Sequence, residues 1–239
     1  MTKGIIFDYG GTIDTNSVHW SEVIWDAYQA EQVPVSKEHY RLAYVHGERS
    51  LAKFPLIQPD HNMLDLLRIK LRIQLGFLID AGLCSPSVPE AVLSQSLAQR
   101  CYDHVLSILI LSRPVLQQLA ERYPLVLVSN FYGNIQAILR DFQLDTLFQQ
   151  VIESAVVGIR KPDPAIFQLG VDALGLQPSE VLVVGDSYSK DIVPAASLGC
   201  STVWIQGKGW GEEPTSDTSV ATHVIHSITE LLPLLLPQR

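Results

Sequence analysis

The fold is indicated first by residues 4–12, which read GIIFDYGGT. Ile5, Ile6 and Phe7 form an apolar run without polar alternation, and the run ends at Asp8 in a glycine turn. A run of this kind is typical of a strand that is buried on both faces of a parallel sheet. We therefore expect a buried strand here, with Asp8 at its carboxyl end.

Similar apolar runs alternate with helical patterns along the rest of the chain. Strand-like runs occupy residues 125–128, 181–184 and 202–205, with weaker candidates at 151–152 and 223–225. Helical patterns occupy residues 134–142 and 113–122, the latter with Pro114 in its expected first turn. Further helices are expected to start at Asp163 and Ser227. Strands that alternate with helices predict an α/β fold with a doubly wound, mainly parallel, Rossmann-like sheet.

One region interrupts this alternation. Residues 15–111 carry only helical patterns, at 18–32, 36–50, 62–79 and 89–108. We interpret this region as a helical cap inserted after the first strand, over an α/β core made of residues 1–14 and 112–239. Residues 207–219 contain three glycines and a proline and are expected to form a surface loop.

Composition limits the class of protein. The 239 residues are 47% hydrophobic and 18% charged, which argues for a folded globular chain. Seventeen Lys and Arg against 25 Asp and Glu leave a net charge of −8, which disfavours general binding to nucleic acid or to an anionic membrane. The three cysteines form no CxxC pair, and no apolar run is long enough to span a bilayer. With no secretory signal after Met1, we expect a cytoplasmic protein, and the oligomeric state stays open.

Polar side chains follow several of the predicted strands. Asp8 follows the first strand, and Ser129 follows the run at 125–128. Asp186 and Asp191 follow the run at 181–184, and Lys161 lies just before a predicted helix. Because ligands bind at the carboxyl ends of strands in open α/β sheets, we expect these groups to gather at one edge.

This combination of groups suits phosphoryl transfer. Clustered carboxylates repel one another unless a cation is present, and oxygen ligands without His or Cys suit Mg²⁺ better than zinc. Lys161 adds a positive charge that can restrain Asp8 and balance phosphate charge. Ser129 and the backbone N–H groups of residues 10–12 are donors for phosphoryl oxygens. We therefore predict a Mg²⁺-dependent phosphoryl-transfer site.

Taken in order, these residues resemble the four motifs of the haloacid dehalogenase superfamily. The first motif is Asp-x-Asp-Gly-Thr after a strand, and residues 8–12 match it except at Gly10. The second, a Ser or Thr after a strand, is matched by Ser129, and the third, a Lys often followed by Pro, is matched by Lys161. The fourth, Gly-Asp-Ser-x-x-x-Asp, is matched by residues 185–191. The resemblance covers essentially the whole chain, including a cap between the first and second motifs.

The resemblance implies a role for each matched residue. Asp8 would be the nucleophile that forms an aspartyl-phosphate, and Lys161 and Ser129 would grip the transferred phosphoryl group. Asp191 would orient Lys161 or metal-bound water. The implied magnesium ligands are Asp8, the main-chain carbonyl of Gly10, Asp186 and Asp191. The implied substrate contacts are Gly11, Thr12, Ser129 and Asn130. The implied substrate is a small phosphorylated metabolite.

Gly10 is the departure from this pattern. Phosphatases of the family carry a second Asp there, which protonates the leaving oxygen and later activates water. Loss of such a general acid and base typically lowers the rate by about 10²–10⁴-fold. We therefore expect a preference for good leaving groups, such as aryl or acyl phosphates. The non-catalytic alternative is a phospho-ligand-binding protein with impaired turnover.

Other branches of the family also lack this Asp. Dehalogenases carry Tyr there and need no metal, so the acidic fourth motif disfavours that branch. A P-type ATPase would need membrane spans. A phosphonatase, with Ala there, hydrolyses a C–P bond and needs a cap lysine for a Schiff base; Lys53 and Lys70 are the candidates. His46, Arg49 and Lys53 are expected in a cap loop that faces the core, either to recognise substrate or as a solvated surface.

Overall fold

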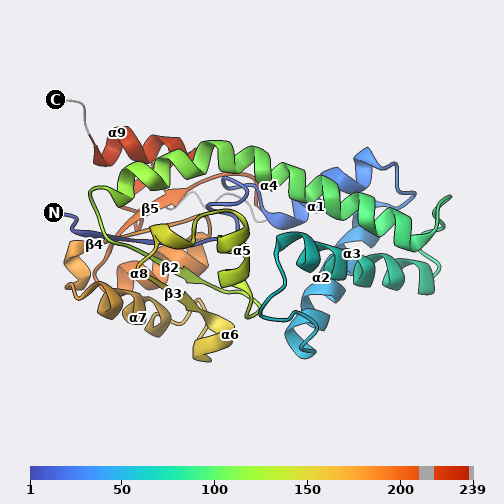
Figure 1. Cartoon of the computed structure of the whole chain (residues 1–239), viewed down its shortest axis with the longest axis horizontal. Helices are drawn as coiled ribbons and strands as arrows, with labels where there is room; N and C mark the ends of the chain where they lie inside the picture. The colour runs from blue at the N-terminus through green and yellow to red at the C-terminus, as the bar shows by residue number, and fades with distance from the viewer. Residues whose placement is uncertain (210–217, 237–239) are drawn as a thin grey trace.

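The computed structural model describes residues 1–209 and 218–236. Within these residues the core is a six-stranded sheet whose paired strands are all parallel (Figure 1). The strands are β1 (Gly4–Phe7), β2 (Leu125–Ser129), β3 (Gln150–Glu153), β4 (Val181–Gly185), β5 (Ser201–Ile205) and β6 (His223–Ile225). Their order across the sheet is β3-β2-β1-β4-β5-β6. The predicted α/β class is confirmed, and both weaker strand candidates are strands.

Helices cover both faces of this sheet (Figure 1). Ile5 and Phe7 pack in one apolar cluster with α4 (Glu90–Ala120) and α5 (Ile135–Asp141). Ile6 packs in a second cluster with α7 (Ala165–Leu174) and α8 (Val193–Ser197). Successive strand residues point to opposite faces, so a strand covered on both sides has no solvent-facing position for polar residues. The short helices are α6 (Ser154–Val157) and α9 (Leu231–Leu235).

The order of the strands reverses direction between β1 and β4. These strands are neighbours, with Phe7 opposite Val184, and the N–H of Asp8 donates to the carbonyl of Val184 at 2.9 Å. A reversal of this kind is where open α/β sheets bind ligands, outside the carboxyl ends of the strands. The topology therefore brings the residues that follow β1 and β4 to one place.

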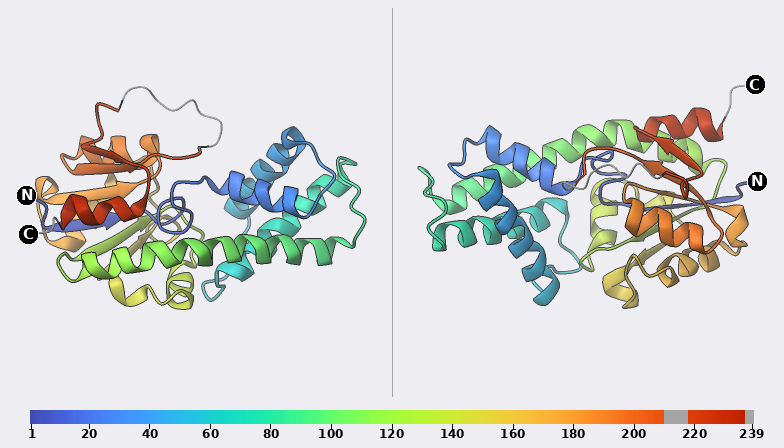
Figure 2. Two further views of the ribbon diagram at one scale, coloured as in Figure 1. Left: turned by 90° about the horizontal axis from the view of Figure 1, so that it is seen from above. Right: turned by 180° about the vertical axis from the view of Figure 1, so that it is seen from behind.

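Beyond the carboxyl ends of the strands lies a group of helices (Figure 2). It contains α1 (Trp20–Ala30), α2 (Lys37–Lys53), α3 (Met63–Asp80) and the first part of α4. The side chains of His19, Ser36 and Asn62 accept hydrogen bonds from first-turn N–H groups and so start α1, α2 and α3. We propose that residues 15–111 act as the cap.

The predicted separate helix at 113–122 is wrong. Residues 90–120 form one helix, α4, with Pro114 inside it, so the expected boundary at residue 112 falls within a helix. Figure 2 shows α4 running from the cap into the core. An internal proline costs roughly 3 kcal/mol. However, α4 is buried on both sides of Pro114, and the Ser112 hydroxyl donates to the carbonyl of Ile13 at 2.7 Å. Tertiary packing therefore outweighs the local cost.

The predicted cap loop with His46, Arg49 and Lys53 is also wrong, because all three residues lie on α2. Buried residues recur at helical spacing along α2, from Tyr40 to Leu51, and this packing keeps the segment helical. Residues 210–217 of the expected surface loop lie outside the described residues. None of the helices in the described part of the chain is long and apolar enough to cross a membrane.

Candidate active site

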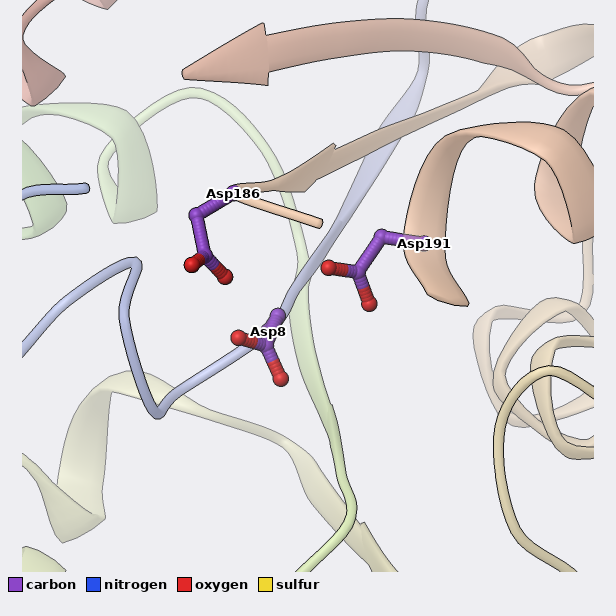
Figure 3. Close-up of side chains that lie close together, drawn as sticks. All are labelled: Asp8, Asp186 and Asp191. Atoms are coloured by element: carbon purple, nitrogen blue, oxygen red, sulfur yellow. The ribbon is translucent and has the colours of Figure 1, made fainter. Parts of the chain in front are cut away.

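Three carboxyl groups from two neighbouring strand ends meet at the reversal point. Asp8 follows β1, and Asp186 follows β4. Asp191 lies a few residues later, within a π-helical turn (Tyr188–Ile192). One oxygen atom from each carboxyl group lies within 4.8 Å of the others. Figure 3 shows the three groups turned toward a common space. The predicted acidic cluster is therefore present in the structure.

Two glycines allow this close approach. The backbone of Gly11 has a φ of +96°, and a Cβ placed there would lie 2.2 Å from Oδ2 of Asp186. A Cβ at Gly185 would lie 2.5 Å from Cβ of Asp191. A side chain at either position would push a carboxyl group away from the cluster.

Lys161 lies between two of the carboxyl groups. Its Nζ is 2.6 Å from Oδ1 of Asp8 and 2.7 Å from Oδ1 of Asp191, and all three residues are buried. The other oxygen of Asp191 accepts from the N–H of Ser187 at 3.0 Å. Asp191 is thus held from both sides, which suits a residue that orients the lysine.

Burial and mutual repulsion dominate the electrostatics of the cluster. Burial, with a contribution from Asp191, raises the pKa of Asp8 to about 6 even though Lys161 opposes the shift. Burial and the neighbouring Asp8 raise the pKa of Asp186 well above its usual value. Burial alone would lower the pKa of Lys161, but Asp191 and Asp8 outweigh it and raise that pKa to about 12. One lysine is therefore too little positive charge for three carboxylates.

The predicted phosphoryl donors differ in what they contact. Ser129 is buried at the end of β2 and lines the cavity above the cluster. The Thr12 hydroxyl donates to Oδ2 of Asp8 at 3.0 Å, and the N–H of Gly11 donates to Oδ1 of Asp14 at 2.7 Å. These two groups therefore order the Asp8 turn, and their contacts with substrate stay a prediction.

Asn130 has a clear local role. Its Nδ2 donates to the carbonyl of Lys161 at 3.0 Å, and its Oδ1 accepts from the N–H of Lys161 at 2.9 Å. This two-way bond links the end of β2 to the lysine segment. Asn130 therefore positions the lysine, in addition to lining the cavity.

A sequence profile of one protein family matches most of the chain. The profile describes haloacid dehalogenase-like hydrolases, and it matches residues 2–199. The chain belongs to this family. The resemblance stated from the four motifs is thereby confirmed.

Relatives of this hydrolase include both phosphatases and dehalogenases. Glyceraldehyde 3-phosphate phosphatase from Pyrococcus furiosus is 34% identical over 42% of this chain and 41% of its own length. (S)-2-haloacid dehalogenase 4A from Burkholderia cepacia is 34% identical over 47% of this chain and 48% of its own. A solved dehalogenase structure with an intermediate complex covers 99% of this chain and 98% of its own, with 22% identity and a TM-score of 0.65, and so shares the fold. The chain spans less than half the length of these two curated relatives.

The space beside Gly10, where the hydrolase lacks the second Asp of the motif, faces an indole ring. Among the described residues, apart from its two chain neighbours, a Cβ at Gly10 would have only Trp20 Nε1 within 4 Å, at 3.9 Å. That indole N–H donates to Oδ2 of Asp14 at 2.9 Å. Both oxygens of Asp14 thus accept hydrogen bonds, and Asp14 is fully buried, so it is not placed to protonate a leaving group. Motif matching missed Asp14 and Trp20; the sequence signal was a further Asp six positions after Asp8, just beyond the glycine turn.

A large cavity connects the carboxyl cluster with the cap. It has a volume of about 1410 Å³, and its lining runs from Asp8, Ser129 and Lys161 to residues of α2 and α3. The site of this hydrolase is therefore shared between core and cap.

One wall of the cavity is a polar cluster of buried Lys70 with half-buried Glu48 and Tyr132, which sequence reasoning did not connect. Lys70 Nζ lies 2.6 Å from Oε1 of Glu48, and Tyr132, which follows β2, donates to Oε2 of the same carboxylate at 2.7 Å. Burial would lower the pKa of Lys70, but Glu48 reverses the shift and raises that pKa well above its usual value. A protonated, paired amine cannot form a Schiff base, which argues against the phosphonatase alternative at Lys70. Lys53 is exposed at the end of α2, over the ring of Phe54.

The raised carboxyl pKa values predict how Mg²⁺ changes thermal stability. A carboxyl group whose pKa is raised by folding stabilises the fold below its unfolded pKa, and that contribution is lost as pH rises through the folded pKa. For Asp8 this contribution is lost between about pH 4 and about pH 6. A divalent cation offsets the repulsion only after the carboxyls ionise. We therefore expect Mg²⁺, compared with EDTA at equal ionic strength, to raise Tm more near pH 8 than near pH 5. An equal shift at both pH values, or none, would contradict this.

Proposed function

We propose that this hydrolase is a Mg²⁺-dependent phosphatase that acts on a small phosphorylated metabolite through an aspartyl-phosphate intermediate. The observation that carries the proposal is the setting of Asp8, which is paired with Lys161 and clustered with Asp186 and Asp191. A nucleophilic carboxylate beside one fixed cation and two further carboxylates suits attack on phosphorus.

The donor set fits magnesium. It offers carboxylate oxygens within 4.8 Å of one another, without His or Cys. Burial and mutual repulsion raise the pKa values of Asp8 and Asp186, and a bound cation would oppose both shifts. Asp8, Asp186 and the carbonyl of Gly10 would hold the ion, with Asp191 orienting water or Lys161. When bound, Mg²⁺ would neutralise charge on the phosphoryl oxygens.

The proposed reaction has two displacements at phosphorus. An Asp8 oxygen attacks phosphorus, and the bond from phosphorus to the leaving oxygen breaks while Lys161 and Ser129 hold the transferred group. Because residue 10 has no carboxyl group, the leaving oxygen takes its proton from water. A water molecule then attacks phosphorus, the bond to Asp8 breaks, and inorganic phosphate leaves with the Asp8 carboxylate restored.

A metal-independent dehalogenase is the second candidate. The observations in its favour are the dehalogenase among the relatives and the absence of an acid at Gly10. In that reaction an Asp8 oxygen would attack carbon, a halide ion would leave, and water would hydrolyse the resulting ester. The Asp186 carboxyl argues against it, because a third carboxyl group near the nucleophile opposes its ionisation unless a cation is bound.

The test compares two substrate classes with and without metal. We expect the purified protein to release 4-nitrophenol from 4-nitrophenyl phosphate with Mg²⁺ and to lose this activity in EDTA. We expect no chloride release from 2-chloropropionate under either condition. Chloride release without metal would replace the phosphatase proposal with a dehalogenase. Inert protein that still binds inorganic phosphate in calorimetry would instead indicate the non-catalytic phospho-ligand-binding alternative.

A further inference from the structure

The cavity is more positively charged than the chain as a whole. Seven Lys or Arg and four Asp or Glu are among the described residues that line it, although the chain has a net charge of −8. Lys161 and Lys70 are paired with lining carboxylates, and Lys208 is paired with buried Glu22 at 2.9 Å. Across residues 1–209 and 218–236, no ion-pair partner is found for four lining cations: Arg49, Lys53, Arg160 and Lys190.

These four cations come from both sides of the cavity. Arg49 and Lys53 lie on α2 of the cap, whereas Arg160 precedes Lys161 and Lys190 precedes Asp191 in the core. All four are exposed, so their side chains can adjust to a ligand. Arg160 and Lys190 therefore adjoin residues of the candidate site in the sequence, and both line the cavity.

His19 and Lys70 lie against the same ring, that of Tyr44, in the wall of the cavity that Lys190 also lines. The ring of His19 lines the cavity, 6.0 Å between centroids from the ring of Tyr44. Burial, together with the positive charges of Lys190 and, less strongly, Lys70, lowers the pKa of His19 to about 4, while Glu48 opposes the shift. A core cation, Lys190, and a cap cation, Lys70, line the cavity together with this half-buried ring.

We propose that this part of the cavity is a second anion subsite, bounded by Lys190, Lys70 and Arg49, and that the substrate is a phosphomonoester with a second anionic group. That group is a carboxylate or another phosphate. The proposal rests on the phosphatase function and adds the class of substrate. Bound Mg²⁺ and Lys161 would match the reacting phosphoryl group, which leaves the remaining cations for a second anion.

The subsite has a rigid base and an adjustable rim. Lys70 is 5% exposed, is held by Glu48, and lies with its Nζ 5.8 Å from the ring centre of Tyr44 and 5.3 Å from that of Tyr132. Among the described residues, no ion-pair partner holds the rim cations Arg49 and Lys190. The base is an ion pair that orients the Lys70 N–H donors, and the rim cations supply the positive charge that discriminates between charged and neutral substrates.

The experiment compares substrates of matched size that differ in charge. The pair is 4-carboxyphenyl phosphate and its methyl ester, 4-(methoxycarbonyl)phenyl phosphate. The phenolate released from the methyl ester substrate is the better leaving group. Leaving-group chemistry alone therefore favours the neutral substrate. We expect the wild type to hydrolyse the carboxylate with a kcat/KM roughly tenfold higher or more, as one charge-assisted hydrogen bond would give. A third substrate, 1,4-phenylene bisphosphate, shows whether phosphate or carboxylate is preferred.

Single variants test the assignment of the subsite. Arg49→Gln and Lys190→Gln are each expected to lower the ratio of the two kcat/KM values several-fold, mainly through KM. Arg122→Gln removes an exposed cation outside the cavity lining and is the matched control, with an unchanged ratio. A wild-type ratio of one or less, or an equal loss in the control, would overturn the proposal.

Failure of the phosphatase function gives a different result. In that case neither aryl phosphate is hydrolysed. Calorimetric binding of the same two compounds then tests the anion subsite by itself. Roughly tenfold tighter binding of the carboxylate, lost in Lys190→Gln, would still support the subsite. Equal affinities would overturn it.

Discussion

Asp8→Asn is expected to remove phosphate ester hydrolysis by at least about 10⁴-fold. Asparagine keeps the size of the side chain but cannot form the phosphoryl ester, because its amide is not a nucleophile toward phosphorus. It also gives up the charge that pairs with Lys161 at 2.6 Å. The measurement is the steady-state release of 4-nitrophenol, together with acid trapping of phosphoprotein in the wild type.

The matched control for this variant is Asp172→Asn. Asp172 is an exposed carboxylate of α7 that accepts a hydrogen bond from Gln168 and lies outside the cavity lining. It should retain wild-type turnover, and both proteins should show a cooperative thermal transition. If folded Asp8→Asn protein hydrolyses aryl phosphates at more than about a tenth of the wild-type rate, Asp8 is not the nucleophile.

Gly10→Asp is expected to raise the hydrolysis of alkyl phosphates by about 10²-fold or more. Wild-type protein should strongly prefer aryl phosphates, because an alkoxide leaves poorly without a proton donor. The described residues leave room for a Cβ: Gly10 is not in the left-handed region, and the nearest atom outside its chain neighbours is Trp20 Nε1, at 3.9 Å. The measurement is the slope of log kcat/KM against leaving-group pKa, which should become shallower.

Gly10→Asn separates acid catalysis from added bulk. Asparagine has nearly the same shape as aspartate and can meet the same indole, but it offers no carboxyl proton. If Gly10→Asn flattens the leaving-group dependence as much as Gly10→Asp, the missing acid is not the reason for the preference. A wild type that hydrolyses alkyl and aryl phosphates equally fast would also contradict the argument.

The strands could be predicted because their signal is local. A strand covered on both faces must be apolar at consecutive positions, and the runs at β1, β2, β4 and β5 satisfy this requirement. The weakness of local signals appears at Pro114, which usually starts a helix but lies inside α4. Packing against the core on either side of the proline is not visible in a short stretch of sequence.

The candidate site was predictable in part for the same reason. Asp8 and Asp186 each end an apolar run, and adjacent parallel strands bring such residues together. The contacts of Tyr132 with Glu48 were not predictable, because 84 residues separate the two side chains and neither belongs to a motif. The indole of Trp20 beside Gly10 is a similar case.

The amino-acid sequence by itself determined which segments form the parallel sheet and which carboxylates follow its strands, since hydrophobic runs and turn residues act over a few neighbouring positions. The tertiary structure alone decided which cap residues meet the carboxyl cluster. Lys190 and Lys70 line the same cavity because the helices of residues 15–111 lie over the strand ends. Electrostatic interaction depends on distance through space, and the order of residues along the chain does not specify that distance for segments so far apart.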